Sequence, residues 1–239
     1  MAAFKYDVVY TEERNRLTTA FRIILAIPHL IIVQVWAYLT EILAVIQWFI
    51  VLFTGRRNQG IWNLQHAWLG YYCRVYGYVD LLYDPYPAFG TDPGPVPVTT
   101  QFSFEEPANR LTNGLRFIWA IPAIVIAAVL GFASFFVLIA SWFAILFTGK
   151  HPRGMFDFIL RVFRFILQTY SYVLLMTDTY PNWASTAEAG APSSVPPTLP
   201  PTTTTAPPPP PPPQQTAPAA PPEAPPTEPP STPPPPPPA

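Results

Sequence analysis

Two long apolar stretches dominate the distribution of hydrophobic and polar positions along the chain. Residues 21–53 contain two charged side chains, Arg22 and Glu41, and residues 115–147 contain only Arg116. An apolar stretch of roughly 18 or more residues with few charges is typical of a membrane-spanning helix, because hydrocarbon does not solvate ionised groups. As a helix, either stretch would be about 50 Å long, against a hydrocarbon core of about 30 Å. We therefore predict two membrane-embedded helices, each longer than one straight crossing.

A proline lies near the start of each apolar stretch. Pro28 and Pro122 remove a backbone donor and clash with the preceding turn, which predicts a kink. We expect each kinked helix to cross the membrane over 29–53 or 123–147. The alternative is a tight helical hairpin that turns near 40–41 in the first stretch and near 131–134 in the second.

An aromatic-rich amphipathic helix is predicted after each stretch, over about 61–82 and 155–176. Arg161, Arg164 and Gln168 are spaced by three and four residues, so they share one helix face, and Arg74 lies on the corresponding face of the earlier helix. Such a helix either lies in the membrane interface with its cations toward phosphate, or crosses the bilayer with its polar face against other helices.

Short alternating segments precede the apolar stretches. Residues 6–10 and 100–104 place apolar and polar side chains in turn, which is typical of a half-buried strand. Because an isolated strand is unstable, we expect the two to pair with each other at the membrane surface. The alternative is an irregular linker.

The chain contains an internal repeat with a constant offset of 94 residues. Asn-Arg-Leu-Thr occurs at 15–18 and 109–112, Ala-Ile-Pro at 26–28 and 120–122, and Leu-Phe-Thr-Gly at 52–55 and 146–149. Asp84, Tyr86 and Pro87 likewise recur as Asp178, Tyr180 and Pro181. Apolar composition alone does not align Pro, Gly, Arg and Asp at one offset, so we infer two tandem copies of one unit.

These motifs resemble a bacterial membrane protein family known as domain of unknown function 4389. The Phe-Thr-Gly-Arg and Phe-Thr-Gly-Lys segments and the Asp-Pro-Tyr-Pro and Asp-Thr-Tyr-Pro segments carry the resemblance in both copies, which covers about 3–90 and 97–184. The first copy departs from it at Asn58, where the second has Pro152, and Glu41 has no counterpart. The resemblance implies a membrane location and a repeated unit, and it supplies no reaction, ligand or catalytic residue.

Polar residues and glycines at the ends of the helices are candidates for structural or interfacial roles. They are Arg16 and Arg110 before the apolar stretches, Arg22 and Arg116 at their starts, Gly55, Arg56, Gly149 and Lys150 after them, and Asp84 and Asp178 beyond the second helices. We expect the arginines to extend toward lipid phosphates, the glycines to end the helices in the left-handed conformation, and the basic residues beside them to lie near headgroups. Each aspartate is expected to pair with an arginine that precedes its own apolar stretch, with Arg16 as the partner to test for Asp84.

The placement of charge bears on topology. Both segments that follow the apolar stretches are basic, and cytoplasmic loops are enriched in Lys and Arg, which favours two crossings per unit and two parallel repeats. We therefore predict four crossings with both termini cytoplasmic. The segments before the stretches are basic too, and a kinked span would place them on the opposite side, so this conflict stays open.

Composition separates a third region from the two units. Residues 1–94 and 95–183 form the repeats, whereas 184–239 hold most of the 35 prolines, with Thr, Ala and Ser. This tail lacks the apolar residues of a core and is predicted to be disordered, with polyproline II segments. It is either a solvated spacer or a docking segment for a protein that binds proline-rich sequences.

The sequence thus predicts an all-α integral membrane protein, multi-pass in the bacterial inner membrane, with short surface strands and a disordered tail. A formal net charge of −1 does not suggest a nucleic-acid partner, and a single cysteine excludes an internal disulfide. We expect membrane lipids as partners, a protein partner for the tail, and no catalytic, metal or cofactor site; the oligomeric state is open. The favoured function is a non-enzymatic accessory or scaffold. Alternatives are a transporter or channel component with a path lined by the polar helix face, and an enzyme acting on lipid headgroups.

Overall fold

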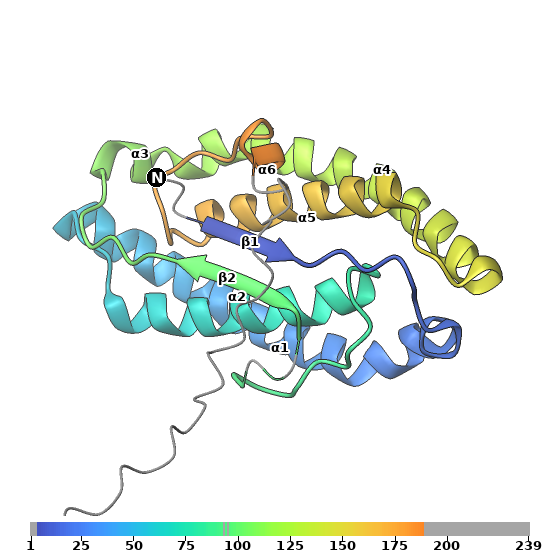
Figure 1. Cartoon of the computed structure of the whole chain (residues 1–239). Helices are drawn as coiled ribbons and strands as arrows, with labels where there is room; N and C mark the ends of the chain where they lie inside the picture. The colour runs from blue at the N-terminus through green and yellow to red at the C-terminus, as the bar shows by residue number, and fades with distance from the viewer. Residues whose placement is uncertain (1–3, 93, 95, 189–239) are drawn as a thin grey trace, which may run out of the picture. The chain divides into compact units, whose positions relative to one another are not determined.

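The computed structural model of the chain, which describes residues 4–92, 94 and 96–188, is built from two long helices, two shorter ones and a two-stranded ribbon (Figure 1). The first long helix, α1, runs without a break over Arg16–Thr54, and its counterpart α4 covers Arg116–Thr148 after a single turn of helix, α3, at Arg110–Gly114. The tight-hairpin alternative is therefore wrong. Each helix also begins well before the predicted 29–53 and 123–147, and includes its proline.

Local sequence determines where the long helices begin and end. The side chains of Asn15 and Asn109 accept hydrogen bonds from the first backbone amides of α1 and α3, which otherwise lack partners. Gly55 and Gly149 end α1 and α4 in the left-handed conformation, with φ of 72° and 76°. This confirms the predicted role of the two glycines, because that conformation costs other residues about 1–2 kcal/mol.

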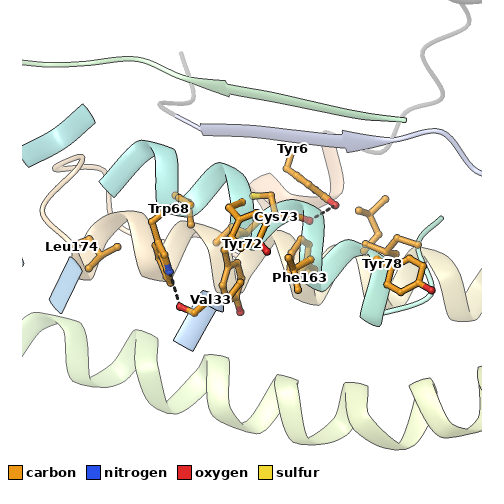
Figure 2. Close-up of a cluster of buried hydrophobic side chains, with 14 of the residues drawn as sticks. Tyr6, Val33, Trp68, Tyr72, Cys73, Tyr78, Phe163 and Leu174 are labelled. Carbon is orange, nitrogen blue, oxygen red and sulfur yellow. Dashed lines mark hydrogen bonds between the residues drawn. The ribbon is translucent and has the colours of Figure 1, made fainter. Parts of the chain in front are cut away.

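The shorter helices, α2 (Gln59–Val79) and α5 (Arg153–Val173), fold back along α1 and α4 respectively. Both are mostly buried, and they lie between the long helices and the ribbon (Figure 2). Trp68 on α2 donates its indole N–H to the Val33 carbonyl of α1, whereas Tyr6 on the ribbon contacts both α2, through Cys73, and α5, through Phe163.

The ribbon consists of β1 (Phe4–Val8) and β2 (Val98–Phe102), paired antiparallel. The predicted pairing between the two repeats is confirmed, and the strands begin two residues earlier than predicted. Tyr6 lies directly opposite Thr100, and these two positions are 94 residues apart. Because neighbouring antiparallel strands are related by a two-fold axis perpendicular to the ribbon, the axis that relates the repeats passes between these residues.

Contacts between the long helices follow the same axis. Trp48, near the end of α1, donates to the Asn113 carbonyl of α3, and Trp142, near the end of α4, donates to the Thr19 carbonyl of α1. Backbone bridges join Glu13 to Lys150 and Arg56 to Pro107, again at equivalent positions. The start of each long helix therefore lies beside the end of the other, so α1 and α4 are antiparallel.

The chain after the second repeat is ordered for slightly longer than predicted. A short helix, α6 (Ser185–Glu188), packs against α5, where the tail was expected to begin at 184. Residues up to α6 belong to one compact unit that includes both repeats. The predicted proline-rich disorder falls on residues 189–239, which lie outside the described residues.

Candidate functional site

An arginine–aspartate cluster joins the two ends of the first repeat; we call Arg14, Arg22 and Asp84 clasp 1. The Arg22 side chain is 2% exposed and donates to Asp84 Oδ1 over 2.7 Å and to the Tyr78 and Tyr83 carbonyls. Asp84 Oδ2 accepts the backbone N–H of Asn15 over 2.9 Å. Arg14 lies 4.0 Å from the same carboxylate.

The second repeat contains clasp 2, formed by Arg57, Arg116 and Asp178. Arg116 donates to Asp178 and to the carbonyls of Tyr172 and Thr177, which are the counterparts of the carbonyls bound by Arg22. Arg57 also donates directly to Asp178, and its Nε donates to the Leu175 carbonyl over 2.7 Å. Both guanidinium groups are buried and share the one negative charge of Asp178, while backbone carbonyls accept hydrogen bonds from their other N–H groups.

The second arginine of each clasp comes from a different position in the repeat. Arg14 precedes α1 in its own repeat, whereas Arg57 reaches clasp 2 from the segment after α1, in the other repeat. At the equivalent positions the chain has Ala108 and His151. Clasp 1 thus takes its second arginine from its own repeat, whereas clasp 2 takes its second arginine from the other repeat.

His151 occupies the place in clasp 1 that Arg57 occupies in clasp 2. It is fully buried and lies edge-on to Phe156. Burial, reinforced by the positive charge of Arg14, lowers the pKa of His151 to about 4. The ring is therefore neutral at physiological pH, which suits a position beside two arginines.

A strained turn after each short helix presents carbonyls to the clasp. Leu81 and Leu175 each have a φ of 61°, a conformation that glycine usually adopts. Both side chains are 2% exposed. Burying a leucine contributes roughly 1.5–3 kcal/mol, which outweighs a conformational cost of about 1–2 kcal/mol. A leucine is therefore favoured here over the expected glycine.

The predicted polar helix face makes contacts within the chain. Arg161, Arg164 and Gln168 all reach the segment from Asn182 to Thr186, and Arg164 also pairs with Asp7 of β1. Arg74 donates to the Gly90 carbonyl over 2.6 Å. These side chains connect each short helix to the polypeptide that follows that helix.

The surface of the long helices is the most unusual feature of the described residues. The buried stripe of α1 contains five of its polar side chains, whereas its exposed face is mostly apolar, with Gln34 and Glu41 exposed near mid-helix; the stripe consists of Thr19, Arg22, Ala26, His29, Val33, Thr40, Ala44, Gln47 and Val51. Of the 18 residues that form the most apolar part of each helix, only 22% are buried in α1 and 6% in α4. This is the reverse of the polarity of a core helix in a water-soluble protein.

Apart from Gln34 and Glu41, this surface consists of large apolar and aromatic side chains between the helix ends. On α1 they include Leu17, Ile24, Ile31, Val35, Tyr38, Ile42, Phe49 and Phe53, and on α4 Phe117, Trp119, Ile121, Val125, Val129, Phe132, Phe136, Phe143 and Phe147. Water-soluble monomers rarely expose contiguous apolar patches beyond a few hundred Å². Both helices are long and apolar enough to cross a membrane. We refer to this surface as the apolar face.

Comparison with known protein families agrees with the repeat. Residues 16–90 and 110–184 each match the family described as Domain of unknown function (DUF4389). The chain belongs to this family. No curated protein matches it, and no solved structure does. The two DUF4389 copies coincide with the two structural repeats, as the motifs predict.

Several predicted site residues in the DUF4389 copies lie close together. Each aspartate pairs with an arginine from the start of its own copy, as expected, but the partner of Asp84 is Arg22 and not Arg16. Arg22 and Arg116 therefore do not extend toward lipid. Arg16 and Arg110 lie instead against the opposite copy, beside Gly149 and Gly55. Arg56 and Lys150 are largely exposed and pair with Glu106 and Glu12.

Two members of the clasps were not predicted for this role. Arg14 and Arg57 lie at positions that differ between the DUF4389 copies, so the repeat alone did not identify them. The first copy has arginine at both positions, whereas the second has Ala108 and His151. This paired difference is the signal in the sequence that the two positions serve the clasps jointly. In the part of the chain that the structure describes, no group of three His, Cys, Asp or Glu side chains could hold a metal ion.

Proposed function

We propose that this protein is a membrane-resident accessory or scaffold of the cell membrane, which anchors its proline-rich C-terminal segment and catalyses no reaction itself. The apolar face carries this proposal, because an exposed apolar surface on two helices of this length suits lipid and not water. The clasps support it further. Their arginines and aspartates are engaged with each other and with backbone carbonyls, which is the arrangement of a rigid support.

A role in transport has less support. A polar path would require Arg161, Arg164 and Gln168 to face an open channel, and each is bonded to β1 or to the chain beyond α5. An enzyme acting on lipid headgroups would require polar groups free to bind substrate near Arg56 or Lys150, and both form ion pairs within the chain.

The first experiment asks whether the chain resides in a membrane. Membranes from cells that express the full chain are washed with carbonate and pelleted, and the same is done with a chain that ends after residue 188. We expect both chains in the pellet, because both keep the apolar face. Recovery of both in the supernatant would refute membrane residence.

The second experiment addresses the scaffold role. Proteins cross-linked to the tail are identified in cells, and their abundance in the membrane fraction is compared between the full chain and the chain that ends after residue 188. A scaffold predicts that a tail-bound protein leaves the membrane fraction when the tail is removed. Solute flux through proteoliposomes that contain the shortened chain, abolished by Arg161→Ala, would overturn the proposal in favour of transport.

A further inference from the structure

The two-fold axis fixes where the ribbon lies relative to the long helices. The axis passes between Tyr6 and Thr100, and it also exchanges α1 with α4. The ribbon is therefore centred at mid-length of the antiparallel helix pair, with α2 and α5 between them (Figure 2). Along this axis the order is ribbon, short helices, long helices.

The two ends of this stack have opposite polarity. The long helices present the apolar face, whereas the ribbon exposes Lys5, Thr99, Thr100 and Gln101. The Arg164–Asp7 ion pair also lies on the ribbon side, near the middle of α5. One face of the stack thus suits hydrocarbon and the other suits water.

An upright orientation, with α1 and α4 crossing the bilayer, conflicts with this order. It would place the centre of the ribbon at the depth of the bilayer midplane, because the ribbon lies at mid-length of the helices. Among the described residues each strand pairs with a second strand on one side only. The Tyr6 carbonyl accepts a hydrogen bond from Arg164, and outer edges of the ribbon would otherwise face lipid. Each unpaired backbone group costs several kcal/mol in hydrocarbon, and open sheet edges are not found there.

Helix length adds a second conflict. With 39 residues α1 is about 58 Å long, and with 33 residues α4 is about 50 Å long, whereas the hydrocarbon core is about 30 Å thick. Only a steep tilt would fit either helix as a crossing, and a tilt does not remove the ribbon from the membrane.

We propose that the protein lies flat in one leaflet of the membrane, with α1 and α4 parallel to the bilayer plane and the ribbon in water. This inference rests on the proposed membrane residence and specifies its form. The apolar face then enters the acyl chains along its whole length, as the apolar side of an interfacial helix does. Exposed ion pairs occur at both ends of the helix pair, Lys150–Glu12 and Arg153–Asp157 at one and Arg56–Glu106 at the other, and the flat orientation places them at the level of the headgroups.

The flat orientation makes a prediction that an upright one reverses. Both ends of α1 face the same aqueous compartment when the helix lies flat, and opposite compartments when it crosses. Thr11 and Gln59 are exposed residues near the two ends. The test protein is the full chain with Thr11→Cys and Gln59→Cys, in which the buried Cys73 is replaced by Ala.

The double-cysteine protein is reconstituted into sealed vesicles that contain anionic lipid and treated with a large, membrane-impermeant maleimide. Each molecule is then scored on a gel for zero, one or two added groups. A flat protein gives molecules with two groups or none, whatever its insertion side, whereas a crossing protein gives molecules with one. Each single-cysteine protein and a detergent-solubilised sample, in which all sites react, serve as controls.

A depth measurement provides a second, independent readout. Spin labels are placed on the apolar face of α1 at Ile24, Val35, Ile42 and Phe53, all of which are exposed. The flat orientation predicts a similar depth for all four. An upright helix predicts that depth changes by about 16 Å between Ile24 and Val35, at 1.5 Å per residue.

The outcomes separate the two proposals. Protein that does not float with the vesicles refutes membrane residence, and the inference about orientation fails with it. Protein that floats but carries one group per molecule, with a depth maximum near mid-helix, refutes the flat orientation alone. A water-soluble dimer that buries the apolar face between two copies would be detected by its mass without detergent, and it would overturn both.

Discussion

Clasp 2 provides the sharpest test of how the two repeats are held together. Asp178 accepts hydrogen bonds from Arg57 of the first repeat, Arg116 of the second and the backbone of Asn109. Replacement of Asp178 by asparagine removes the negative charge while keeping the size and one oxygen acceptor. Two guanidinium groups, 1% and 2% exposed, are then left without a counter-charge.

The expected loss follows from the burial of the three groups. Breaking a buried ion pair costs about 3–5 kcal/mol, and the 29% exposure of the Asp178 side chain lets water offset part of this. We expect Asp178→Asn to lower the free energy of unfolding by about 3 kcal/mol, or roughly 6–12 °C in Tm for a protein of this size. Asp84→Asn should cost about 2 kcal/mol, because Arg14 lies 4.0 Å from Asp84 and depends on it less.

Thermal unfolding of the purified full chain in detergent measures both losses. Arg116→Gln and the double variant with Asp178→Asn complete a cycle, and the double loss should be at least 1 kcal/mol smaller than the sum of the single losses. Arg16→Gln is the matched control in the first repeat, since it removes an exposed arginine that does not contact Asp84, and it should be additive with Asp84→Asn. Additive losses at clasp 2, or a change below 0.5 kcal/mol for Asp178→Asn, would refute the reasoning.

Three further predictions concern the same region. Gly149→Ala should lower unfolding stability by about 1–2 kcal/mol through its positive φ, whereas Gly154→Ala, where a Cβ meets nothing within 4 Å, should have little effect in the same melt. Arg57→His should destabilise the chain by about 2–4 kcal/mol. Adding Ala108→Arg should recover part of this loss, because clasp 2 would then have the same side chains as clasp 1; no recovery would contradict the equivalence of positions 14 and 108. The pKa of His151 is about 4 in the folded chain and about 6.5 in the unfolded chain, so the free energy of unfolding should fall by at most about 3 kcal/mol as pH drops from 6.5 to 4. In thermal melts at a series of pH values, His151→Gln should lack this pH-dependent loss.

The repeat and its main elements were accessible from the sequence because they depend on local patterns. A constant offset defined the two copies, and apolar runs, capping residues and alternation gave the helices and the ribbon. The choice between Arg16 and Arg22 as partner of Asp84 was also open to a local argument. Arg22 is in phase with Thr19, Ala26 and His29 on the buried stripe, whereas Arg16 is not.

How the two repeats are arranged relative to each other could not be predicted, because it depends on contacts between residues far apart in the sequence. The predicted topology assumed that each long helix crosses the membrane, which places the basic segments before and after it on different sides. An antiparallel pair places the two kinds of segment together at each end. If the pair lies flat, both ends also face one compartment, and the conflict in charge placement disappears without any crossing.

The uneven distribution of arginines between the repeats has a consequence for how the two halves would behave as separate chains. Two copies of the first half, assembled as a homodimer with the same symmetry, would crowd Arg14, Arg22 and Arg57 around each aspartate, whereas two copies of the second half would leave a single arginine there. Only the mixed pair gives each aspartate two. The halves, expressed as separate subunits, should therefore select each other over themselves.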